Sequence, residues 1–404
     1  MERTYAKITV TPKGERALRG GHPWVFDAEV TDVSGAPENG AIVDICTQKG
    51  RWLGSGFYNA NSKIRVRCFS RNANDRFDES YWRRALRYAV DYRRAVLSEE
   101  DFRCCRLVFG EADHFPGLTV DRFENVLVTE TLSLGMERIK GLLFPALTEI
   151  LRDGGAEIDA VYERNESALR EKEGMERGKG FFCGEGDGHV EIRENGISYD
   201  VDYIGGQKTG FFLDQKFNRR AVRQIARGRR VLDCFTHTGA FGLNAAAGGA
   251  AHITSVDISA DALAQARRNA ERNGLSGQID FVCADVFDWL TDLAAKGGKG
   301  DYDFIILDPP AFTKSGATVK SAFRGYKEIN LKAMKLLPRG GYLATCSCSH
   351  FMTDALFREM LRQAASDAAV ELRQIEARQQ GPDHPILWNV PETDYLKFYL
   401  FQVV

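Results

Sequence analysis

The stretch RVLDCFTHTGAFG, Arg230–Gly242, decides the fold that the rest of the sequence must satisfy. Arg230–Phe235 is an apolar run typical of a strand, Thr236–Gly239 has turn chemistry, and the small residues from Ala240 onward favour a helix. A strand that ends in a tight glycine turn and opens a helix directs backbone N–H groups outward, where they bind nucleotide-like ligands. The stretch therefore predicts a ligand-binding turn at the edge of a doubly wound sheet.

Strands and helices alternate from Arg229 to the end of the sequence. The strand-like runs are RRVLDCF, HITSVDIS, QIDFVCAD, DYDFIILD, GYLATCSCS, AVELRQI and YLKFYLFQVV, with helix-like runs between them. The alternation predicts an α/β domain with a mostly parallel seven-stranded sheet covered on both faces. Because right-handed crossovers bring the carboxyl ends of parallel strands to one edge, we expect the functional residues there.

Two smaller domains are expected before this sheet. Residues 1–75 show short alternating strands, which predicts a small β-barrel, and residues 76–188 combine strands with helices near residues 78–97 and 137–152. The glycine-rich segment Gly174–His189 is typical of an exit linker. The third domain, residues 189–404, begins with a β-hairpin that turns at Asn195-Gly196.

The composition is that of a globular protein without a membrane segment. Of 404 residues, 44% are hydrophobic and 27% charged; no apolar run reaches the roughly 18 residues of a membrane span, and the N-terminus lacks a signal peptide's apolar core. We therefore expect a cytoplasmic protein without membrane contact. Nine cysteines without a CxxC pair favour reduced thiols, so we expect no metal.

The charge is unevenly distributed. A net charge of −2 argues against a globally basic nucleic-acid coat, yet seven Lys and Arg residues stand against a single Asp between Lys49 and Arg76. Five more arginines lie on the predicted helix near residues 78–97. These residues favour a surface that contacts polyanions, while a solvated strand face without a partner explains the first group equally well.

Carboxylates end several of the predicted strands. Asp257 follows Gly239 by 18 residues, which suits a carboxylate that binds both ribose hydroxyls, and Asp285 is placed to hold an adenine amino group. The turn lacks GxGxxG and presents Asp233, which disfavours NAD and favours the positively charged S-adenosylmethionine. A helix N-cap explains each carboxylate taken singly. Their recurrence at successive strand ends favours function.

The segment LDPPAF, Leu307–Phe312, adds a substrate-facing group. Pro309 and Pro310 rigidify the backbone after an apolar strand and present Asp308 beside the cofactor, while Phe312 can stack on a planar base. A Pro-Pro turn that only ends a strand is the plainer alternative.

Two cysteines follow on a neighbouring strand. Cys346 and Cys348 are two residues apart and so share one face. Cys348 is nearer the edge and is the candidate nucleophile, whereas Cys346 is expected to pack inside the sheet. An inert buried thiol is the alternative for either, but Cys348 opposite Asp308 favours a nucleophile.

The residues before the organising stretch suggest a lid. GGQKTGFFLDQKFN places the aromatic pair Phe211 and Phe212 close to Asp214 and Gln215 at the start of a helix. The aromatic pair there could cover the ligand, and a hydrophobic staple at the helix start explains it equally well.

Taken in order, these motifs resemble the bacterial family of large-subunit ribosomal RNA methyltransferases that has an N-terminal PUA domain, a central α+β domain and a class I S-adenosylmethionine domain. The matching motifs are GQKTGFFLDQ, LDCFTHTGAF, VDIS, DPPAF, RGYKEIN, SCSH and DHP. The resemblance covers essentially the whole sequence and implies a Rossmann-like fold, S-adenosylmethionine as cofactor and 5-methylcytosine in 23S rRNA as product. It assigns no role to Cys346 or to the C-terminal LWNVPETDYLKFYLFQVV.

Residue roles follow from the motifs and the resemblance together. Carbon 5 of cytosine is a poor nucleophile, so we expect Cys348 to add to carbon 6 and Asp308 to hydrogen-bond or protonate ring nitrogen 3. The target base must be single-stranded or flipped out. The expected cofactor-binding residues are Phe212, Asp214, Gln215, Asp233, Phe235, Thr236, Thr238, Gly239, Asp257, Ile258, Asp285, Val286 and Asp308, and the expected substrate-binding residues are Pro309, Pro310, Phe312 and Tyr326.

Other functions stay open at this point. A methyltransferase that acts on a base nitrogen would use an Asp-Pro-Pro-aromatic turn without a thiol. A non-catalytic RNA-binding or ribosome assembly factor would use only the N-terminal barrel. NAD-dependent oxidoreduction is a more distant alternative, and a homodimer is compatible with the sequence.

Overall fold

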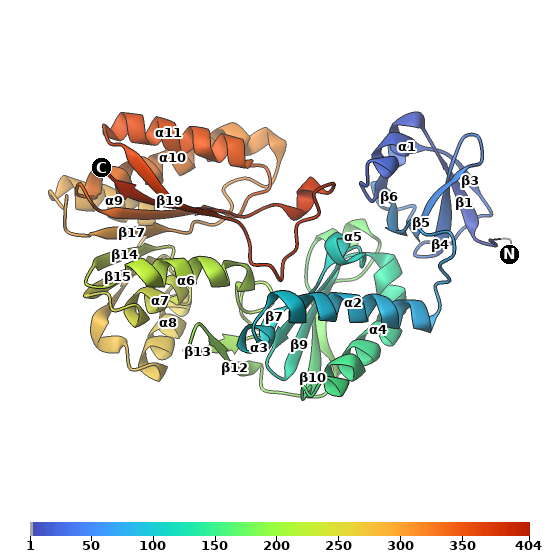
Figure 1. Ribbon diagram of the computed structural model, residues 1–404, viewed down its shortest axis with the longest axis horizontal. Coiled ribbons are helices and arrows are strands. Elements are labelled where there is room, and N and C mark those ends of the chain that lie inside the picture. The colour runs from blue at the N-terminus through green and yellow to red at the C-terminus, as the bar shows by residue number, and fades with distance from the viewer. Residues whose placement is uncertain (1–2) are drawn as a thin grey trace. The chain divides into compact units, whose positions relative to one another are not determined.

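The computed structural model describes residues 3–404, which form two compact units (Figure 1). Unit 1 comprises Met1–Ile192, Val201–Leu213 and Pro382–Thr393. Unit 2 comprises Arg193–Asp200, Asp214–Gly381 and Asp394–Val404. The domain boundaries expected after residues 75 and 188 stay predictions. No helix within residues 3–404 combines the length and the apolar character needed to cross a bilayer.

The N-terminal part of unit 1 is a six-stranded sheet in the order β2-β6-β5-β4-β1-β3. Its apolar face buries Ile8, Val25, Val43 and Val66 completely, in agreement with the alternation in the sequence. One helix was not expected from the sequence: α1 begins after Thr11, whose hydroxyl accepts from the backbone N–H of Gly14. The strands are β1 (Ala6–Val10), β2 (Trp24–Phe26), β3 (Val30–Ser34), β4 (Ile42–Thr47), β5 (Trp52–Tyr58) and β6 (Ile64–Ser70), and α1 spans Pro12–Arg19.

A five-stranded sheet in the order β11-β10-β9-β8-β7 forms the rest of unit 1, with helices α2 and α4 packed against each other (Figure 1). The expected linker at Gly174–His189 is wrong in part, because Gly178–Cys183 is strand β11, paired antiparallel with β10. Glycines and polar residues on this edge strand hide the alternation that identifies a strand. The elements are α2 (Glu79–Val96), α3 (Glu99–Phe102), β7 (Cys104–Phe109), β8 (Leu118–Phe123), β9 (Val126–Thr131), α4 (Leu134–Asp153), β10 (Ala160–Asn165) and α5 (Leu169–Lys172).

Unit 2 contains the seven-stranded sheet that the sequence predicts, in the order β16-β15-β14-β17-β18-β20-β19. The first five strands are parallel, and β20 runs antiparallel to both of its neighbours. The strands are β14 (Arg230–Cys234), β15 (His252–Asp257), β16 (Ile279–Cys283), β17 (Phe304–Leu307), β18 (Tyr342–Ser347), β19 (Leu372–Arg378) and β20 (Lys397–Val403). The helices are α6 (Lys216–Ile225), α7 (Ala240–Ala247), α8 (Ala260–Arg272), α9 (Val286–Ala295), α10 (Val319–Leu336) and α11 (Asp354–Ala368).

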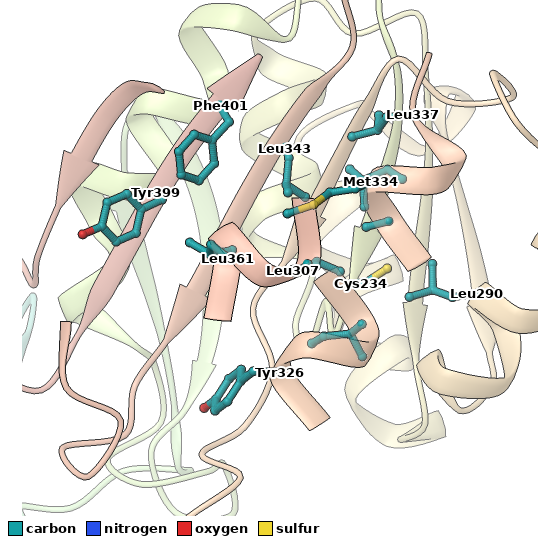
Figure 2. Packing of buried hydrophobic residues seen from close by; sticks show 14 of the residues in the cluster. Cys234, Leu290, Leu307, Tyr326, Met334, Leu337, Leu343, Leu361, Tyr399 and Phe401 are labelled. Carbon is teal, nitrogen blue, oxygen red and sulfur yellow. The ribbon is translucent and has the colours of Figure 1, made fainter. Parts of the chain in front are cut away.

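A hydrophobic core of unit 2 lies between this sheet and the helices α9, α10 and α11 (Figure 2). Leu307 and Leu343 on neighbouring strands and Met334 on α10 have no exposed surface. A close-packed core of this kind fixes where each strand ends. The edge that carries Asp308 and Cys348 therefore rests on a rigid scaffold.

The hairpin of β12 (His189–Glu194) and β13 (Ile197–Asp202) turns at Asn195-Gly196, as expected, with φ of 54° and 75°. Its turn belongs to unit 2 and holds α6 in place. Arg219 of α6 pairs with Glu194 through two bonds of 2.6 and 2.7 Å, and both side chains are buried. Asn195 donates to the carbonyl of Lys216 at 3.1 Å.

Candidate active site

The carboxyl ends of the parallel strands bring four of the predicted site residues to one edge of the unit 2 sheet. Asp257 is the last residue of β15, Asp308 follows β17 directly and Cys348 follows β18 directly. Asp285 caps the helix after β16. The register places Leu307 opposite Thr345, so Asp308 and Cys346 are the next residues of adjacent parallel strands.

The turn after β14 has a strained backbone. Phe235, His237 and Gly239 all have positive φ, at 62°, 50° and 84°. Non-glycine residues rarely adopt this conformation, and such strain gathers at ligand-binding turns. A Cβ on Gly239 would lie 3.0 Å from Cβ of Ala266 in α8, so the turn also requires glycine sterically.

The carboxylate of Asp233 holds this turn in place through hydrogen bonds. It has no exposed surface, and its Oδ2 accepts from the hydroxyl of Thr236 and from the N–H of Gly242 at 2.8 Å. Burial raises the pKa of Asp233 to about 7, against the effect of those two hydrogen bonds. In the structure, Asp233 and the buried Thr236 hydrogen-bond to each other and so shape the loop. Their direct contact with the cofactor stays a prediction.

Asp257 is the carboxylate best placed for a ribose. Its Oδ2 accepts from the N–H of His237 at 2.8 Å and its Oδ1 from the N–H of Ser259 at 2.9 Å, which fixes its orientation while part of it stays exposed. The next residue, Ile258, is 70% exposed, which suits an apolar contact with an adenine ring.

Asp285 is the N-cap of α9, which is the alternative that the sequence analysis considered for each carboxylate. It accepts from the N–H of Phe287 at 2.7 Å and from the N–H of Asp288 at 3.3 Å, and its side chain is exposed. Val286, which begins α9, is buried in the core. Thr238 is partly buried, and its carbonyl accepts from Asn269 at 3.2 Å. Cofactor contact by these residues stays a prediction.

Asp308 ends a chain of hydrogen bonds from α6. Asn218 donates to Oε1 of Gln215 at 2.6 Å, which orients the amide so that its Nε2 donates to Oδ1 of Asp308 at 2.9 Å. Burial raises the pKa of Asp308 to about 7, and the charges of Asp214 and Asp233 act in the same direction. At neutral pH this carboxyl group therefore exists in both protonation states, which suits a group that exchanges a proton.

The two thiols at the end of β18 lie in different surroundings. Cys346 has no exposed surface and its Sγ lies within hydrogen-bonding reach of Asp308 and Gln215. Burial raises the pKa of the Cys346 thiol well above its usual value. Cys348 is partly exposed and lies close enough to Lys397 and Tyr326 for their charges to interact. The sequence placed Cys348 opposite Asp308, but the strand register brings Cys346 next to Asp308 instead.

Lys397 and Tyr395 belong to the C-terminal stretch to which the sequence assigned no role. Nζ of Lys397 donates to the carbonyls of Ser349 at 2.7 Å and Tyr395 at 2.9 Å, and the side chain is almost fully buried. Burial lowers the pKa of Lys397 to about 8, which still leaves most of it protonated at neutral pH. The hydroxyl of Tyr395 donates to Asp214 at 2.6 Å. A lysine at the start of an otherwise apolar strand is the sequence feature that could have indicated this role.

The Pro-Pro segment is lined by aromatic rings. The ring of Phe312 is partly exposed and lies 4.5 Å from that of Tyr326 and 5.8 Å from that of Phe287. Pro309 is buried and Pro310 is exposed. Tyr326 has no exposed surface, so its structural place is in the core beneath Phe312, and its substrate contact stays a prediction.

The predicted residue Phe212 lies in unit 1, where the ammonium of Lys208 sits 5.8 Å from its ring centre. Its contact with the cofactor stays a prediction. Within residues 3–404, no group of three or more His, Cys, Asp or Glu side chains is arranged to hold a metal ion. The site residues fit S-adenosylmethionine: a strained turn, a partly exposed carboxylate at Asp257 and an exposed apolar neighbour suit its ribose and adenine.

Comparison with known proteins defines the class. Residues 162–401 match the model of the S-adenosylmethionine-dependent methyltransferase family, and residues 8–71 match a PUA-like domain. The first match covers more than half of the chain. The protein therefore belongs to the S-adenosylmethionine-dependent methyltransferase family, and S-adenosylmethionine is its cofactor.

Curated relatives match over nearly the full length. Ribosomal RNA large subunit methyltransferase I of Klebsiella pneumoniae (strain 342) is 37% identical over 402 residues, which covers 99% of this chain and 99% of the relative. The protein of the same name from Pseudoalteromonas translucida is 40% identical over 391 residues, 96% of this chain and 97% of the relative. The likeness therefore extends over both units.

Solved structures share the fold. A protein assigned as a methyltransferase and solved with bound SAH aligns over 98% of this chain and 100% of its own, with 23% identity and a TM-score of 0.83. A protein from Streptococcus mutans assigned as a methyltransferase that depends on S-adenosylmethionine gives a TM-score of 0.82 over the same shares, also at 23% identity. The expected fold, an α/β class I methyltransferase domain with an N-terminal PUA-like β domain, is thereby confirmed.

Proposed function

We propose that the protein methylates carbon 5 of a cytosine in large-subunit ribosomal RNA and that Cys348 bonds covalently to that base during the reaction. The names of the curated relatives and the PUA-like domain support an RNA substrate. The observation that carries the proposal is that the adjacent parallel strands β17 and β18 end at the same edge of the sheet, with Asp308 directly after β17 and Cys348 directly after β18. This arrangement offers a nucleophile and an acid at the edge where we place the cofactor.

The chemistry requires both groups. The thiolate of Cys348 adds to carbon 6, forming an S–C bond and shifting electron density toward carbon 5 and nitrogen 3. Asp308, with a pKa near 7, donates a hydrogen bond or proton to nitrogen 3 as that charge develops. S-adenosylmethionine supplies the electrophilic methyl group. A base then takes the carbon 5 proton, and the C–H electrons re-form the ring double bond and expel the thiolate.

The surroundings of the two thiols favour Cys348 as the nucleophile. Full burial of Cys346 disfavours its thiolate, whereas Cys348 is partly exposed and has the Lys397 ammonium nearby. Phe312 offers a partly exposed ring for stacking the target base, which must leave any helix to reach the site.

The test is nucleoside analysis of methylated RNA. The purified protein is incubated with labelled S-adenosylmethionine and unmodified large-subunit rRNA, which is then digested and analysed by mass spectrometry. We expect 5-methylcytidine, no product with Cys348→Ala, and unchanged binding of S-adenosylhomocysteine to that variant. Label on a base nitrogen would favour the methyltransferase that needs no thiol. RNA binding without methyl transfer to any ribosomal substrate would favour an assembly factor.

A further inference from the structure

Unit 1 contains a pocket that the methyl-transfer site does not explain. Its volume is about 930 Å³, and its walls come from the segment after β6, from helix α2, from the turn at residues 112–114 and from residues 385–387. The lining residues that bear on its role are Arg71, Arg84, Tyr88, Tyr92, Asp113 and His114. The volume is in the range of sites that hold a small organic ligand.

Helix α2 presents two unusually exposed rings to this pocket. Tyr88 is 66% exposed and Tyr92 is 38% exposed, one helical turn apart on the same face. The small residues Ala85 and Ala89 of the same helix also line the pocket, which leaves room above the helix. The hydroxyl of Tyr92 donates to the carbonyl of Pro382 at 3.0 Å, so this ring is fixed as part of the wall. An exposed ring such as that of Tyr88 is a stacking surface for a planar group.

The polar lining favours an anion next to that planar group. Asp113 is neutralised by the buried Arg93, which bonds it at 2.6 and 2.7 Å. Asp75 accepts from Ser70 at 2.6 Å and lies 3.7 Å from Arg84. The exposed Arg71 then adds a positive charge to a lining whose carboxylates are already paired. A planar group stacked on tyrosine with an anion on arginine is the chemistry of a nucleotide.

His114 adds a group that can distinguish one base edge from another. It has a left-handed backbone with φ of 63°, and its side chain is exposed in the pocket lining. Desolvation by the surrounding protein lowers the pKa of His114, so its ring is neutral at physiological pH. A neutral imidazole carries one hydrogen-bond donor and one acceptor.

We propose that this pocket holds one unpaired nucleotide of the RNA substrate, with its base stacked on Tyr88 and its phosphate at Arg71. The inference rests on the proposed function only in taking RNA as the substrate. It adds a recognition subsite that lies in unit 1 and takes no part in the chemistry. Because bases inside a duplex cannot reach such a surface, the subsite selects single-stranded RNA.

The test uses the full-length protein and a single-stranded RNA oligonucleotide that carries 2-aminopurine, whose fluorescence is quenched on stacking. We expect Tyr88→Ala to weaken binding by about fivefold or more and to remove the quenching, because one base–aromatic stack is lost. Tyr88→Phe keeps the ring and should bind like the unchanged protein. Leu169→Ala, at a position 51% exposed on α5, controls for the loss of exposed apolar surface.

Three outcomes would overturn the subsite proposal, and a fourth would refute the proposed function alone. Equal RNA affinity and quenching in Tyr88→Ala would exclude base stacking, and so would an equal loss with a duplex of the same sequence. Unchanged RNA binding together with lost capture of a ribosomal protein would assign the pocket to a protein partner. Methyl transfer is measured on the same variants: RNA binding that depends on Tyr88 without any methyl transfer would refute the proposed function and leave the subsite standing.

Discussion

Two cysteines at the end of β18, two residues apart, differ in exposure to solvent and in the charge of their neighbours. The thiol of Cys346 is enclosed with Asp308 and Gln215, whereas Cys348 is partly exposed near the ammonium of Lys397. A thiolate is stabilised by a nearby cation and opposed by burial. These surroundings are the reason that the proposed mechanism uses Cys348, and not Cys346, as the nucleophile.

Replacing Lys397 tests this electrostatic relation. We expect Lys397→Met to slow alkylation of Cys348 by iodoacetamide about tenfold near pH 7, because the neighbouring cation is lost. The pKa of Lys397 is near 8, so the difference between the two proteins should shrink as the pH rises through that value. Peptide mass mapping measures the rate at Cys348, and the exposed Cys183 serves as the internal reference. Equal rates near pH 7 would contradict the account.

The buried Asp233 predicts a pH dependence of stability. The folded state keeps a proton on Asp233 up to a pKa of about 7, whereas its ordinary value is 3.8. The folded state thus binds more protons between these values, and the free energy of unfolding should fall as the pH rises from about 4 to about 7. Asp233→Asn should reduce this fall, on the order of 2–4 kcal/mol, in urea titrations at pH 5 and pH 7.5. Asp285→Asn, at an exposed cap, should leave the fall as it is.

At the scale of elements, the glycine turn between β14 and α7 is the part of the site that depends most on backbone geometry. We expect Gly239→Ala to lower the free energy of unfolding by about 1–2 kcal/mol through its positive φ. Crowding against Ala266 should also weaken S-adenosylhomocysteine binding, which calorimetry measures. Gly274→Ala is the matched control, since Gly274 has a φ of 66° and nothing within 4 Å of its Cβ position. Equal ligand affinity in both variants would show that the turn does not hold the cofactor.

The secondary-structure elements also show what could be predicted from the sequence. The positions of Asp257 and Asp308 at strand ends could be predicted because apolar runs followed by turn residues mark the end of a strand locally. Strand β11 was missed because an edge strand with glycines has no alternation, and Lys397 received no role because its partners, the carbonyls of Ser349 and Tyr395, are set by sheet pairing. Which carboxylate caps a helix and which shapes a turn depends likewise on the folded backbone.

For the whole molecule, the basic strand predicted near the N-terminus is only partly available to RNA. Arg67 lies over the ring of Trp24 and pairs with Glu111 at 3.2 Å and Glu173 at 3.0 Å. The neighbouring Phe69 packs on Trp82 of α2, with ring centres 5.2 Å apart. Deleting the N-terminal sheet would therefore expose the core of the rest of unit 1. Whether the N-terminal sheet binds RNA is therefore tested by substituting its surface residues and not by deleting it.

The exposed residues Lys49, Arg51 and Lys63 provide those substitutions. Replacing all three by alanine should weaken RNA binding and make the slope of log affinity against log salt concentration shallower by up to about 2, at about 0.7 per phosphate contact. Binding of S-adenosylhomocysteine should stay the same. The exposed pair Lys296 and Lys299 in unit 2 gives a comparison for general loss of charge. An unchanged slope in the triple variant would remove the N-terminal sheet from the RNA-binding surface.

The central claim, a covalent bond between Cys348 and the target cytosine, is tested most directly with rRNA that contains 5-fluorocytidine. The fluorine cannot leave as a proton does, so the adduct should persist after methyl transfer and survive denaturing electrophoresis. The account predicts an adduct with the unchanged protein and with Cys346→Ala, and none with Cys348→Ala. An adduct that persists in Cys348→Ala, or methylated RNA without any adduct, would contradict it.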